Sequence, residues 1–503
     1  MSIQQWTLLV LLIGVFYRLI RYAVRMPIWG DEAMLAVNFL ERDWEVLFEP
    51  LKNGQVLPIA YLAVSWILMT FAGFSEWVLR FPATIASITV LVLLYRFAST
   101  RFEQPQMLAV VSILAVSYYS VRHGVEFKPY STDLLVALLL LILAFEVKLR
   151  PQLTSIRTLF AISICLAPFF SYPSVFVIAG CLAALVLDGL LNSNKSQIIF
   201  ATLLGLVAVS IFGIYYVFYI QPHSSANNIL FVKWRDAFPP ADAWAFPGWL
   251  IKQSTGRIMA YPIGSNNYGS SLTFLAFLAG ILSLTQKRQY YFLAILLLPF
   301  VFTIIASSLH LYPYGQSARI AQHLAPSICI LSGFGVVWVF RLGKGRLDAK
   351  ILKRRVIIFS AVLSFLGIAG MGHTIVKPYK TKGVQDVREV VENILSTHNC
   401  QPVKVLNPKD FVPVNFRWYL GFDRRADFAY AVQDLDNKML DVECLFLFDA
   451  IRYPKLQKVL DNQLAKMVNK YSVIQDIEEK AFIYGGKNHP HTYRLVILQK
   501  TSS

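Results

Sequence analysis

The sequence predicts a polytopic α-helical membrane protein with about eleven transmembrane helices, additional interfacial helices and a C-terminal soluble α/β domain. Its 503 residues are 56% hydrophobic and 15% charged, whereas soluble chains carry about 25% charged residues. The apolar residues form long runs, without the alternating pattern typical of a membrane barrel. The net charge of +17 comes from Lys and Arg in short connectors, a distribution typical of membrane topology rather than nucleic-acid binding.

Apolar runs of spanning length, roughly 17–25 residues, define the predicted helices. The first run lacks a basic leader and a small-residue cleavage site, so we expect a retained span rather than a signal peptide. The predicted spans are 6–24, 81–99, 107–121, 131–147, 158–170, 173–191, 198–220, 271–286, 290–309, 321–340 and 356–375.

A further apolar run, Val56–Phe74, decides the topology because a span there would move every later loop to the other side. If it does not span, the connectors richest in Lys and Arg, such as 341–355, all lie on the cytoplasmic side. We therefore expect Val56–Phe74 to lie along or dip into the outer interface. Arg18, Arg21 and Arg25 fit this rule poorly, and we expect them to reach lipid headgroups or to bind an anion.

The chain changes character after Lys377, so we predict a transmembrane domain at 1–376, with a first outer loop at 25–80, and an extracytoplasmic α/β domain at 377–503. Cys400 and Cys444 could form a disulfide in an extracytoplasmic domain, whereas Cys165, Cys181 and Cys329 lie in apolar runs and are expected in the core. The predicted helices are Val384–His398 and Tyr453–Val468, and the predicted strands are Val403–Asn407, Cys444–Asp449, Tyr471–Ile474, Ala481–Tyr484 and Tyr493–Leu498.

With this topology, ionisable residues gather in the outer loops. The adjacent acids Asp31 and Glu32 occupy the first loop, and ionisable groups near membrane depth are candidates for function. A carboxylate can take a proton from an attacking hydroxyl, and Lys or Arg can hold a phosphate. The two acids could instead polarise a helix that begins near Ala33. The other polar residues of these loops are Lys52, His123, Glu126, Lys128, Tyr130, Tyr312, Tyr314, Arg319 and His323.

Several segments resemble the membrane glycosyltransferases of GT-C fold and family 39 type, which include protein O-mannosyltransferases and lipid A aminoarabinose transferases. The likeness covers roughly the first 190 residues, with a weaker echo at 312–319, and rests on the order and spacing of moderately specific motifs. Two positions depart from the family pattern, at Gln55–Leu57 and at Lys128, which stands where the family has Arg. The segments that carry the resemblance are Trp29–Ala33, Gln55–Tyr61, Phe74–Ala83 and Tyr119–Tyr130.

The resemblance implies an inverting glycosyltransferase that uses a polyprenyl-phosphate sugar donor and a lipid, protein or glycan acceptor hydroxyl at the outer membrane face. Asp31 is the implied general base, with Glu32 supporting it or helping to bind the acceptor or a metal. Any divalent cation would be held by Asp31 and Glu32, and the sequence predicts no other cofactor. The implied donor-phosphate contacts are Arg80, Lys128, Arg319 and Lys52, and the implied pocket residues are Glu126, Tyr130, His123, Tyr312, Tyr314 and His323.

Two other function classes stay open at this point. A lipid transporter or flippase could line its path with the same charges, but transporters commonly show paired repeats and broken helices at the midplane. A sensor or assembly scaffold would leave the loop charges unexplained. Arg80, Glu126, Lys128, Arg319, His310 and His323 could also be ordinary interfacial polar residues. The short loops favour a bacterial inner membrane.

Overall fold

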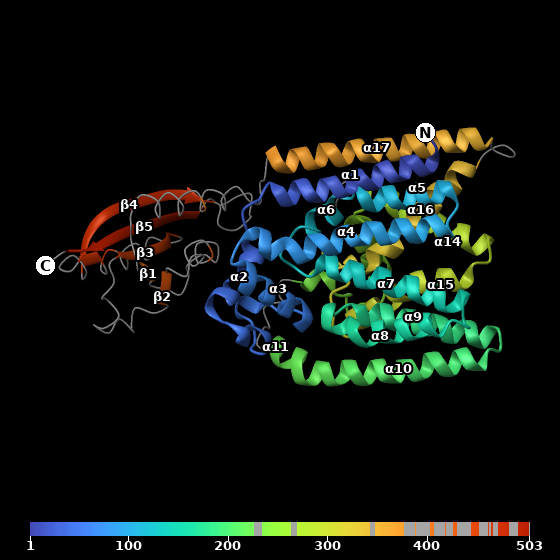
Figure 1. The fold of residues 1–503 in the computed structure, drawn as a ribbon, viewed down its shortest axis with the longest axis horizontal. Coiled ribbons are helices and arrows are strands. Elements are labelled where there is room, and N and C mark those ends of the chain that lie inside the picture. The colour runs from blue at the N-terminus through green and yellow to red at the C-terminus, as the bar shows by residue number, and fades with distance from the viewer. Residues whose placement is uncertain are drawn as a thin grey trace.

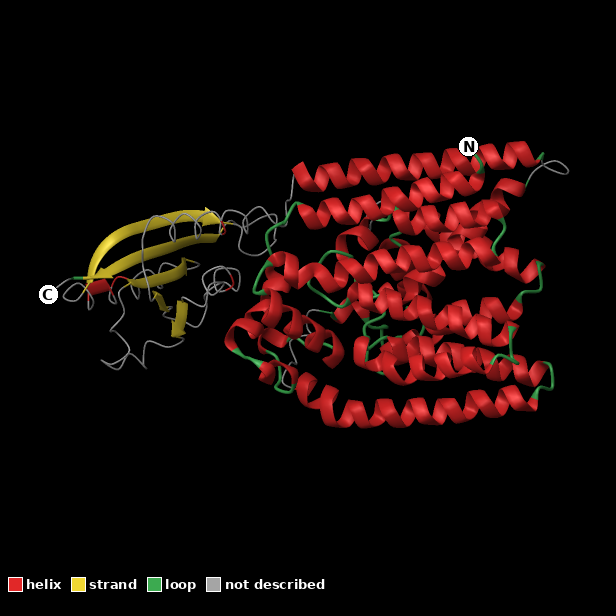
Figure 2. Ribbon diagram, viewed as in Figure 1, coloured by secondary structure: helices red, strands yellow, loops and turns green. Residues whose placement is uncertain are grey.

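The computed structural model describes residues 1–225, 234–262, 269–342 and 348–376, and beyond these five strands together with Arg388, Trp418, Asp461, 464–465 and Thr501. Long helices run side by side through a bundle, and a sheet lies beyond one end of it (Figure 1). Figure 2 shows the contrast between the helical bundle and the strand-bearing second part.

Every predicted span corresponds to a helix of the bundle, which confirms the predicted fold class. Within the described residues, seven helical segments are long and apolar enough to cross a membrane, while α5, α8 and α14 are shorter. The helices that match the predicted spans are α1 (Ile3–Ala23), α4 (Glu76–Arg101), α5 (Gln104–Ala115), α7 (Tyr130–Leu149), α8 (Thr154–Phe170), α9 (Ser174–Leu191), α10 (Lys195–Tyr215), α14 (Gly269–Gln286), α15 (Tyr290–Ser308), α16 (Ala325–Arg341) and α17 (Ala349–Val376).

The remaining helical pieces are short. Most of them follow α1 or lie between α10 and α14, where polar residues and prolines interrupt the apolar runs. They are α2 (Gly30–Glu41), η1 (Trp44–Leu47), η2 (Lys52–Gly54), α3 (Ile59–Ala72), α6 (Tyr118–His123), η3 (Tyr216–Ile220), α11 (Gln221–Ser225), η4 (Arg235–Ala237), α13 (Phe246–Gln253), η5 (Ser254–Ile258) and η6 (Gln322–Leu324).

The bundle has two distinct ends, and the one that carries α2 is called the α2 end here (Figure 1). Loops distant in sequence meet there: the Tyr118 N–H donates to the Pro262 carbonyl at 3.0 Å. At the opposite end, ion pairs link the connectors to one another, such as Arg101–Glu146 at 2.6 Å and Lys287–Glu103 at 2.6 Å.

Helix α3 begins and ends at the α2 end, so it does not cross the bundle. At its start the Ile59 N–H donates to the Tyr215 hydroxyl at 3.0 Å, at the end of α10. Just after it, Glu76 pairs with Arg25 at 2.9 Å, directly beyond α1. Its 14 residues are also fewer than the 17 or so that a span needs. This arrangement agrees with the expectation for Val56–Phe74.

Arg18, Arg21 and Arg25 have different surroundings in the structure, although they form one cluster in the sequence. Arg18 is fully buried and donates to Ser87 and Ser120 at 2.6 Å and to the carbonyls of Gly14 and Ala115 at 2.9 and 3.0 Å. The expectation of a headgroup or anion contact is therefore wrong for Arg18, which ties α1 to α4, α5 and α6.

The second part contains a five-stranded mixed sheet in the order β2-β1-β3-β5-β4. The predicted break between Tyr471–Ile474 and Ala481–Tyr484 is wrong, because β4 is continuous and absorbs a register shift between Val473 and Gln475. The strand β2 was not predicted. The strands are β1 (Val403–Leu406), β2 (Ala426–Ala429), β3 (Cys444–Ile451), β4 (Tyr471–Ala481) and β5 (His491–Lys500).

Arg388 and Trp418 join this second part to the α2 end. Arg388 donates to Glu76 at 3.1 Å, and the ring centroids of Trp418 and Phe74 are 6.5 Å apart. The predicted helices Val384–His398 and Tyr453–Val468 fall almost wholly outside the described residues. Cys400 also lies outside them, so its disulfide with Cys444 stays a prediction.

Candidate functional site

Asp31 lies in the first turn of α2, a position that favours acidic residues because the helix dipole is positive there. Arg319, which follows α15 in a loop, donates to the Asp31 carboxylate with an Nη1–Oδ2 distance of 2.5 Å. The Asp31 side chain is 34% exposed and the Arg319 side chain is 22% exposed, so reactants can reach the pair. Burial alone would lower the pKa of Arg319, but Tyr130 and Asp31 raise it, so the guanidinium stays charged.

Glu32 differs completely from its neighbour because it has no exposed surface. Its carboxylate binds Arg80 through two hydrogen bonds, Nε–Oε1 at 2.9 Å and Nη2–Oε2 at 2.6 Å. The Phe127 N–H donates to Oε1 at 2.6 Å. Arg80 also donates to the carbonyls of Met26 and Pro27. The Glu32–Arg80 pair therefore joins α2, α4 and the 124–129 loop.

Lys128 presents a buried ammonium group to the same region. Its side chain is buried, and Nζ donates to the Gln55 side-chain oxygen. Among the described residues no carboxylate forms an ion pair with it. Burial lowers the pKa of Lys128 to about 8, with Asp31 opposing that shift and Arg319 adding to it. A positive charge without a paired carboxylate suits binding of a phosphate.

Glu126 forms a second buried acidic centre next to Lys128. Arg122 donates to it with an Nε–Oε1 distance of 2.9 Å, and His123 Nδ1 lies 2.6 Å from Oε2. Burial opposes ionisation of Glu126, but His123 and Arg122 hold the pKa of its carboxyl well below its usual range. Because burial lowers the pKa of His123, we take Arg122 as the charged partner that keeps Glu126 ionised.

The Trp29 indole connects these groups. The Arg122 guanidinium carbon lies 5.7 Å from the Trp29 ring centroid and that of Arg319 lies 5.8 Å from it. Arg319 also lies 5.3 Å from the ring of Trp234. Aromatic faces attract guanidinium groups at these distances. The two rings therefore help to hold Arg319 beside Asp31.

The other predicted pocket residues pack against aromatic side chains. The His123 ring stacks on Tyr119 and meets the edge of Tyr130, with centroid distances of 5.5 and 5.3 Å. Tyr312 and His323 pack against each other, 5.8 Å between centroids, and both contact α9 through Phe176. The buried Tyr314 packs on Trp249 of α13. Lys52 lies exposed on η2.

Arg122, Gln55 and Trp29 are site residues that the sequence did not indicate. The four-residue spacing of Arg122 and Glu126 matches that of a helical ion pair and could have indicated their contact. The roles of Gln55 and Trp29 depend on contacts made across 73 and 290 residues of sequence, to Lys128 and Arg319, and no local pattern reports such contacts.

A metal site would need oxygen ligands that are free to turn toward an ion. Among the described residues no group of three or more His, Cys, Asp and Glu side chains is arranged to hold one. Both Glu32 oxygens already accept hydrogen bonds from Arg80 or Phe127. The predicted Asp31–Glu32 metal pair therefore does not fit the observed geometry.

Comparison with known proteins supports the fold. A family model described as dolichyl-phosphate-mannose-protein mannosyltransferase matches residues 57–216. Two crystal structures of ArnT from Cupriavidus metallidurans are similar. The one bound to undecaprenyl phosphate has a TM-score of 0.62 at 10% identity, covering 100% of this chain and 99% of ArnT. The apo structure has a TM-score of 0.55 at 10% identity, covering 98% of each chain. No curated protein matches the sequence.

These findings agree with the fold that the motifs of the first 190 residues predicted. The chain has the fold of the GT-C membrane glycosyltransferases, and the similarity to ArnT includes the second, strand-bearing part. The family model does not reach Asp31 or Arg319, so the arrangement of the site rests on the geometry described above.

Proposed function

We propose that this protein, which has the fold of a membrane glycosyltransferase, moves a sugar from a polyprenyl-phosphate donor to an acceptor hydroxyl with inversion at the anomeric carbon. The observation that carries the proposal is the accessible Asp31–Arg319 pair beside the buried Lys128 ammonium. A base, a phosphate-binding pair of cations and apolar helices for a lipid tail are the parts that such a transfer requires.

In the proposed reaction Asp31 takes the proton of the acceptor hydroxyl as its oxygen bonds to the anomeric carbon. The bond from that carbon to the phosphate oxygen breaks, and its electron pair leaves with the polyprenyl phosphate. Lys128 and Arg319 neutralise the charge that develops on the departing phosphate, which is where fixed cations accelerate a transfer most. The ArnT structure with bound undecaprenyl phosphate supports a carrier of this class.

Arg319 has two possible partners in this scheme. It neutralises Asp31 at 2.5 Å in the structure, and a paired carboxylate is a weaker base. An incoming donor phosphate would draw Arg319 away from Asp31 and free the carboxylate to accept a proton. Donor binding would thus prepare the base, so that proton transfer waits for a loaded site.

Glu32 and Arg80 have a positioning role in this proposal. All the hydrogen bonds described for the Arg80 guanidinium run to Glu32, Met26 and Pro27. We therefore assign the donor phosphate to Lys128 and Arg319, and assign to Arg80 the task of fixing the loop on which Asp31 sits. Glu126 and Arg122 brace the 122–128 segment that carries Lys128.

The α2 end is proposed to face the extracytoplasmic side of a bacterial inner membrane. The connectors at the opposite end carry clustered basic residues, such as Arg101, Lys148 and Arg341, and basic connectors favour the cytoplasm. The charges of the site gather at one end of the bundle, whereas a transporter places them near the midplane. No observation favours the transporter hypothesis.

The test is Asp31→Asn in the full-length purified protein, supplied with undecaprenyl-phosphate-linked sugars and with heat-inactivated membrane extract as the source of acceptor, and assayed for release of free undecaprenyl phosphate. Loss of a general base lowers a rate by roughly 10²- to 10⁴-fold, so release should fall by at least that lower factor. Glu49→Gln is the matched control, because Glu49 is an exposed carboxylate in the same loop, paired with Arg42 at 3.6 Å. Wild-type release by a well-folded Asp31→Asn protein would reject Asp31 as the base.

A further inference from the structure

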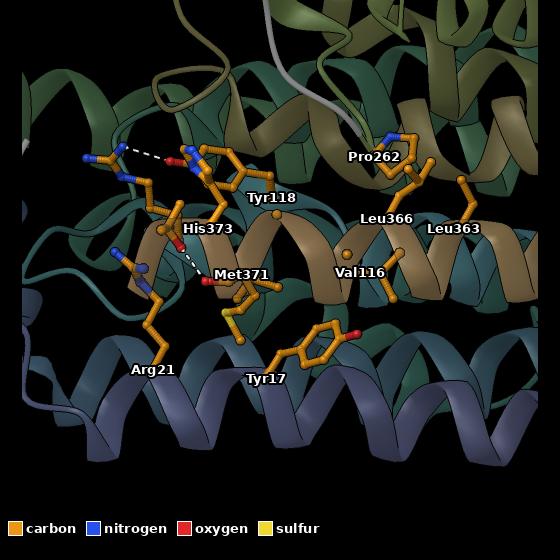
Figure 3. A pocket seen from close by; sticks show the side chains of 14 residues that line it. Tyr17, Arg21, Val116, Tyr118, Pro262, Leu363, Leu366, Met371 and His373 are labelled. Carbon is orange, nitrogen blue, oxygen red and sulfur yellow. Dashed lines mark hydrogen bonds between the residues drawn. The ribbon is translucent and has the colours of Figure 1, made fainter. Parts of the chain in front are cut away.

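A cavity of about 260 Å³ lies on the side of the bundle where α1 and α17 run together, with α6 and Pro262 forming its inner wall (Figure 3). Asp31, Lys128 and Arg319 do not line it. The cavity is therefore separate from the proposed donor-phosphate site, although Arg122 contributes to both regions.

One part of this cavity is basic. Arg21, Arg122 and His373 line it, and no acidic residue is among the lining side chains. Arg122 is largely neutralised by Glu126 at 2.9 Å. Arg21 has no such partner among the described residues, and its buried Nε makes no hydrogen bond. Figure 3 shows Arg21 reaching from α1 toward the level of His373 on α17. A guanidinium held in this way attracts an anion.

The rest of the cavity is apolar and shaped by small residues. Tyr17, Leu363 and Leu366 line it, and Gly367 and Gly370 leave a furrow along α17. A Cβ atom built on Gly370 would meet no atom within 4 Å, so the space beside it is open. Leu366 is 39% exposed, which means that the furrow reaches the outer surface of the bundle.

The surface around the furrow indicates what can enter it. Phe16 and Leu19 on α1 are 60% and 46% exposed, and Phe365 and Ile368 on α17 are 68% and 53% exposed. Apolar side chains exposed on spanning helices face lipid tails. Bilayer lipids would therefore lie next to the opening, and the positive charge of Arg21 would favour those that carry a negative charge.

We propose that this cavity is a binding site for an anionic glycerophospholipid of the surrounding bilayer. The lipid phosphate would accept hydrogen bonds from Arg21 and meet His373, and one acyl chain would lie in the α17 furrow beside Gly367 and Gly370. This lipid would fill the gap between α1 and α17 next to Arg122, which contacts the Trp29 ring of the proposed active site at 5.7 Å.

The experiment measures which lipids the full-length protein retains. The protein is purified in detergent with equal amounts of phosphatidylglycerol and phosphatidylcholine, and retained lipid is counted by native mass spectrometry. Wild-type protein should keep one phosphatidylglycerol in preference to phosphatidylcholine. Arg21→Gln should weaken that retention by about tenfold, the effect of losing a hydrogen bond to a charged group.

Two leucine substitutions on α17 separate filling of the furrow from a general effect on the helix. Gly370→Leu fills the furrow and should abolish retention. Gly372→Leu is its matched control, because Gly372 also has open space around it but does not line the cavity. Melting temperatures are compared for all variants, and retention by the wild-type protein decides the question even if a variant does not fold.

Three results would overturn the proposal. One is equal retention of phosphatidylcholine and phosphatidylglycerol by wild-type protein. Another is unchanged retention of phosphatidylglycerol in folded Arg21→Gln and Gly370→Leu proteins. The third is displacement of the bound phosphatidylglycerol from wild-type protein by equimolar undecaprenyl phosphate, which would assign the cavity to the carrier lipid instead. None of these readouts depends on transferase activity.

Discussion

Glu32 and Arg80 form a buried bidentate ion pair, with Nε–Oε1 at 2.9 Å and Nη2–Oε2 at 2.6 Å, directly beside the accessible Asp31. These two consecutive carboxylates thus have opposite surroundings: Glu32 is buried against the Arg80 guanidinium, whereas Asp31 is accessible in the proposed site. The pair fixes the start of α2 against α4, so that the Asp31 side chain has a defined position.

Replacing Arg80 with Ala should destabilise the protein strongly. Breaking one side of a buried ion pair leaves the other charge uncompensated and costs about 3–5 kcal/mol. Thermal unfolding in detergent should show a clear drop in the melting temperature. Arg42→Ala, which removes the partner of the exposed Glu49, should change it little. An Arg80→Ala protein that melts like the wild type would show that the pair does not hold α2.

Arg319→Gln should lower kcat/KM for the polyprenyl-phosphate donor by roughly 10- to 100-fold, the range for loss of a charged hydrogen bond. The reason is that Arg319 is the accessible cation at Asp31. Lys52→Gln is the comparison, because Lys52 is an exposed cation on η2 that the sequence also suggested for the phosphate. Steady-state kinetics of donor consumption measure both, and a larger effect at Lys52 would reverse the assignment.

The donor kcat/KM should fall as the pH rises through about 8. Burial lowers the pKa of Lys128 to about 8, so the cationic form that binds phosphate predominates below that pH and disappears above it. A pH series from 6.5 to 9.5 measures the change. Lys128→Arg should move the fall to much higher pH, because an arginine stays protonated throughout this range.

The pH profiles of kcat and of kcat/KM, measured on the wild-type enzyme, give an internal check that Lys128 is the group that titrates. kcat/KM reports ionisations of the free enzyme and kcat those of the loaded one. The bound donor is a phosphodiester with one negative charge, which stabilises the charged form of Lys128, so kcat should fall at a higher pH than kcat/KM does. A kcat/KM fall that stays at the same pH in the Lys128→Arg protein would show that another group titrates.

The transmembrane part of the fold could be predicted because its signal is local. A run of about 20 apolar residues makes a spanning helix almost regardless of its neighbours, and loop charge was enough to judge that Val56–Phe74 turns back. Strand limits in the second part were harder to place. β4 contains Asp476, Glu478 and Glu479, and these acidic residues made the sequence look like two short strands. The strand is continuous because it pairs with β5 along its length.

The sequence indicated several side chains that lie close together in the structure, but not the contacts that distinguish them. Asp31 and Glu32 look alike in sequence, and their difference arises from Arg80, which lies 48 residues after Glu32. Arg18 likewise resembled its neighbours Arg21 and Arg25, but Ser87, Ser120 and two carbonyls enclose it. Pairing across such distances depends on how helices pack, which one sequence does not state.

Two glycine-to-alanine substitutions, one at a close helix contact and one in open space, should change the stability of the protein in opposite directions. A Cβ atom on Gly335 of α16 would lie 1.8 Å from the Ala276 carbonyl oxygen of α14, a backbone atom that cannot move away alone. Gly335→Ala should therefore destabilise the bundle by about 1–3 kcal/mol, the usual range for overpacking. Small residues at such crossings are what lets membrane helices approach closely.

Gly213 of α10 is the matched control, because a Cβ atom there would meet nothing within 4 Å. Gly213→Ala should stabilise the protein slightly, since alanine is favoured over glycine in a helix by up to about 1 kcal/mol. Thermal unfolding in one detergent, at one protein concentration, compares the two variants with the wild type. Stabilisation of the protein by both substitutions would mean that helix propensity, and not the α14–α16 contact, sets the effect at Gly335.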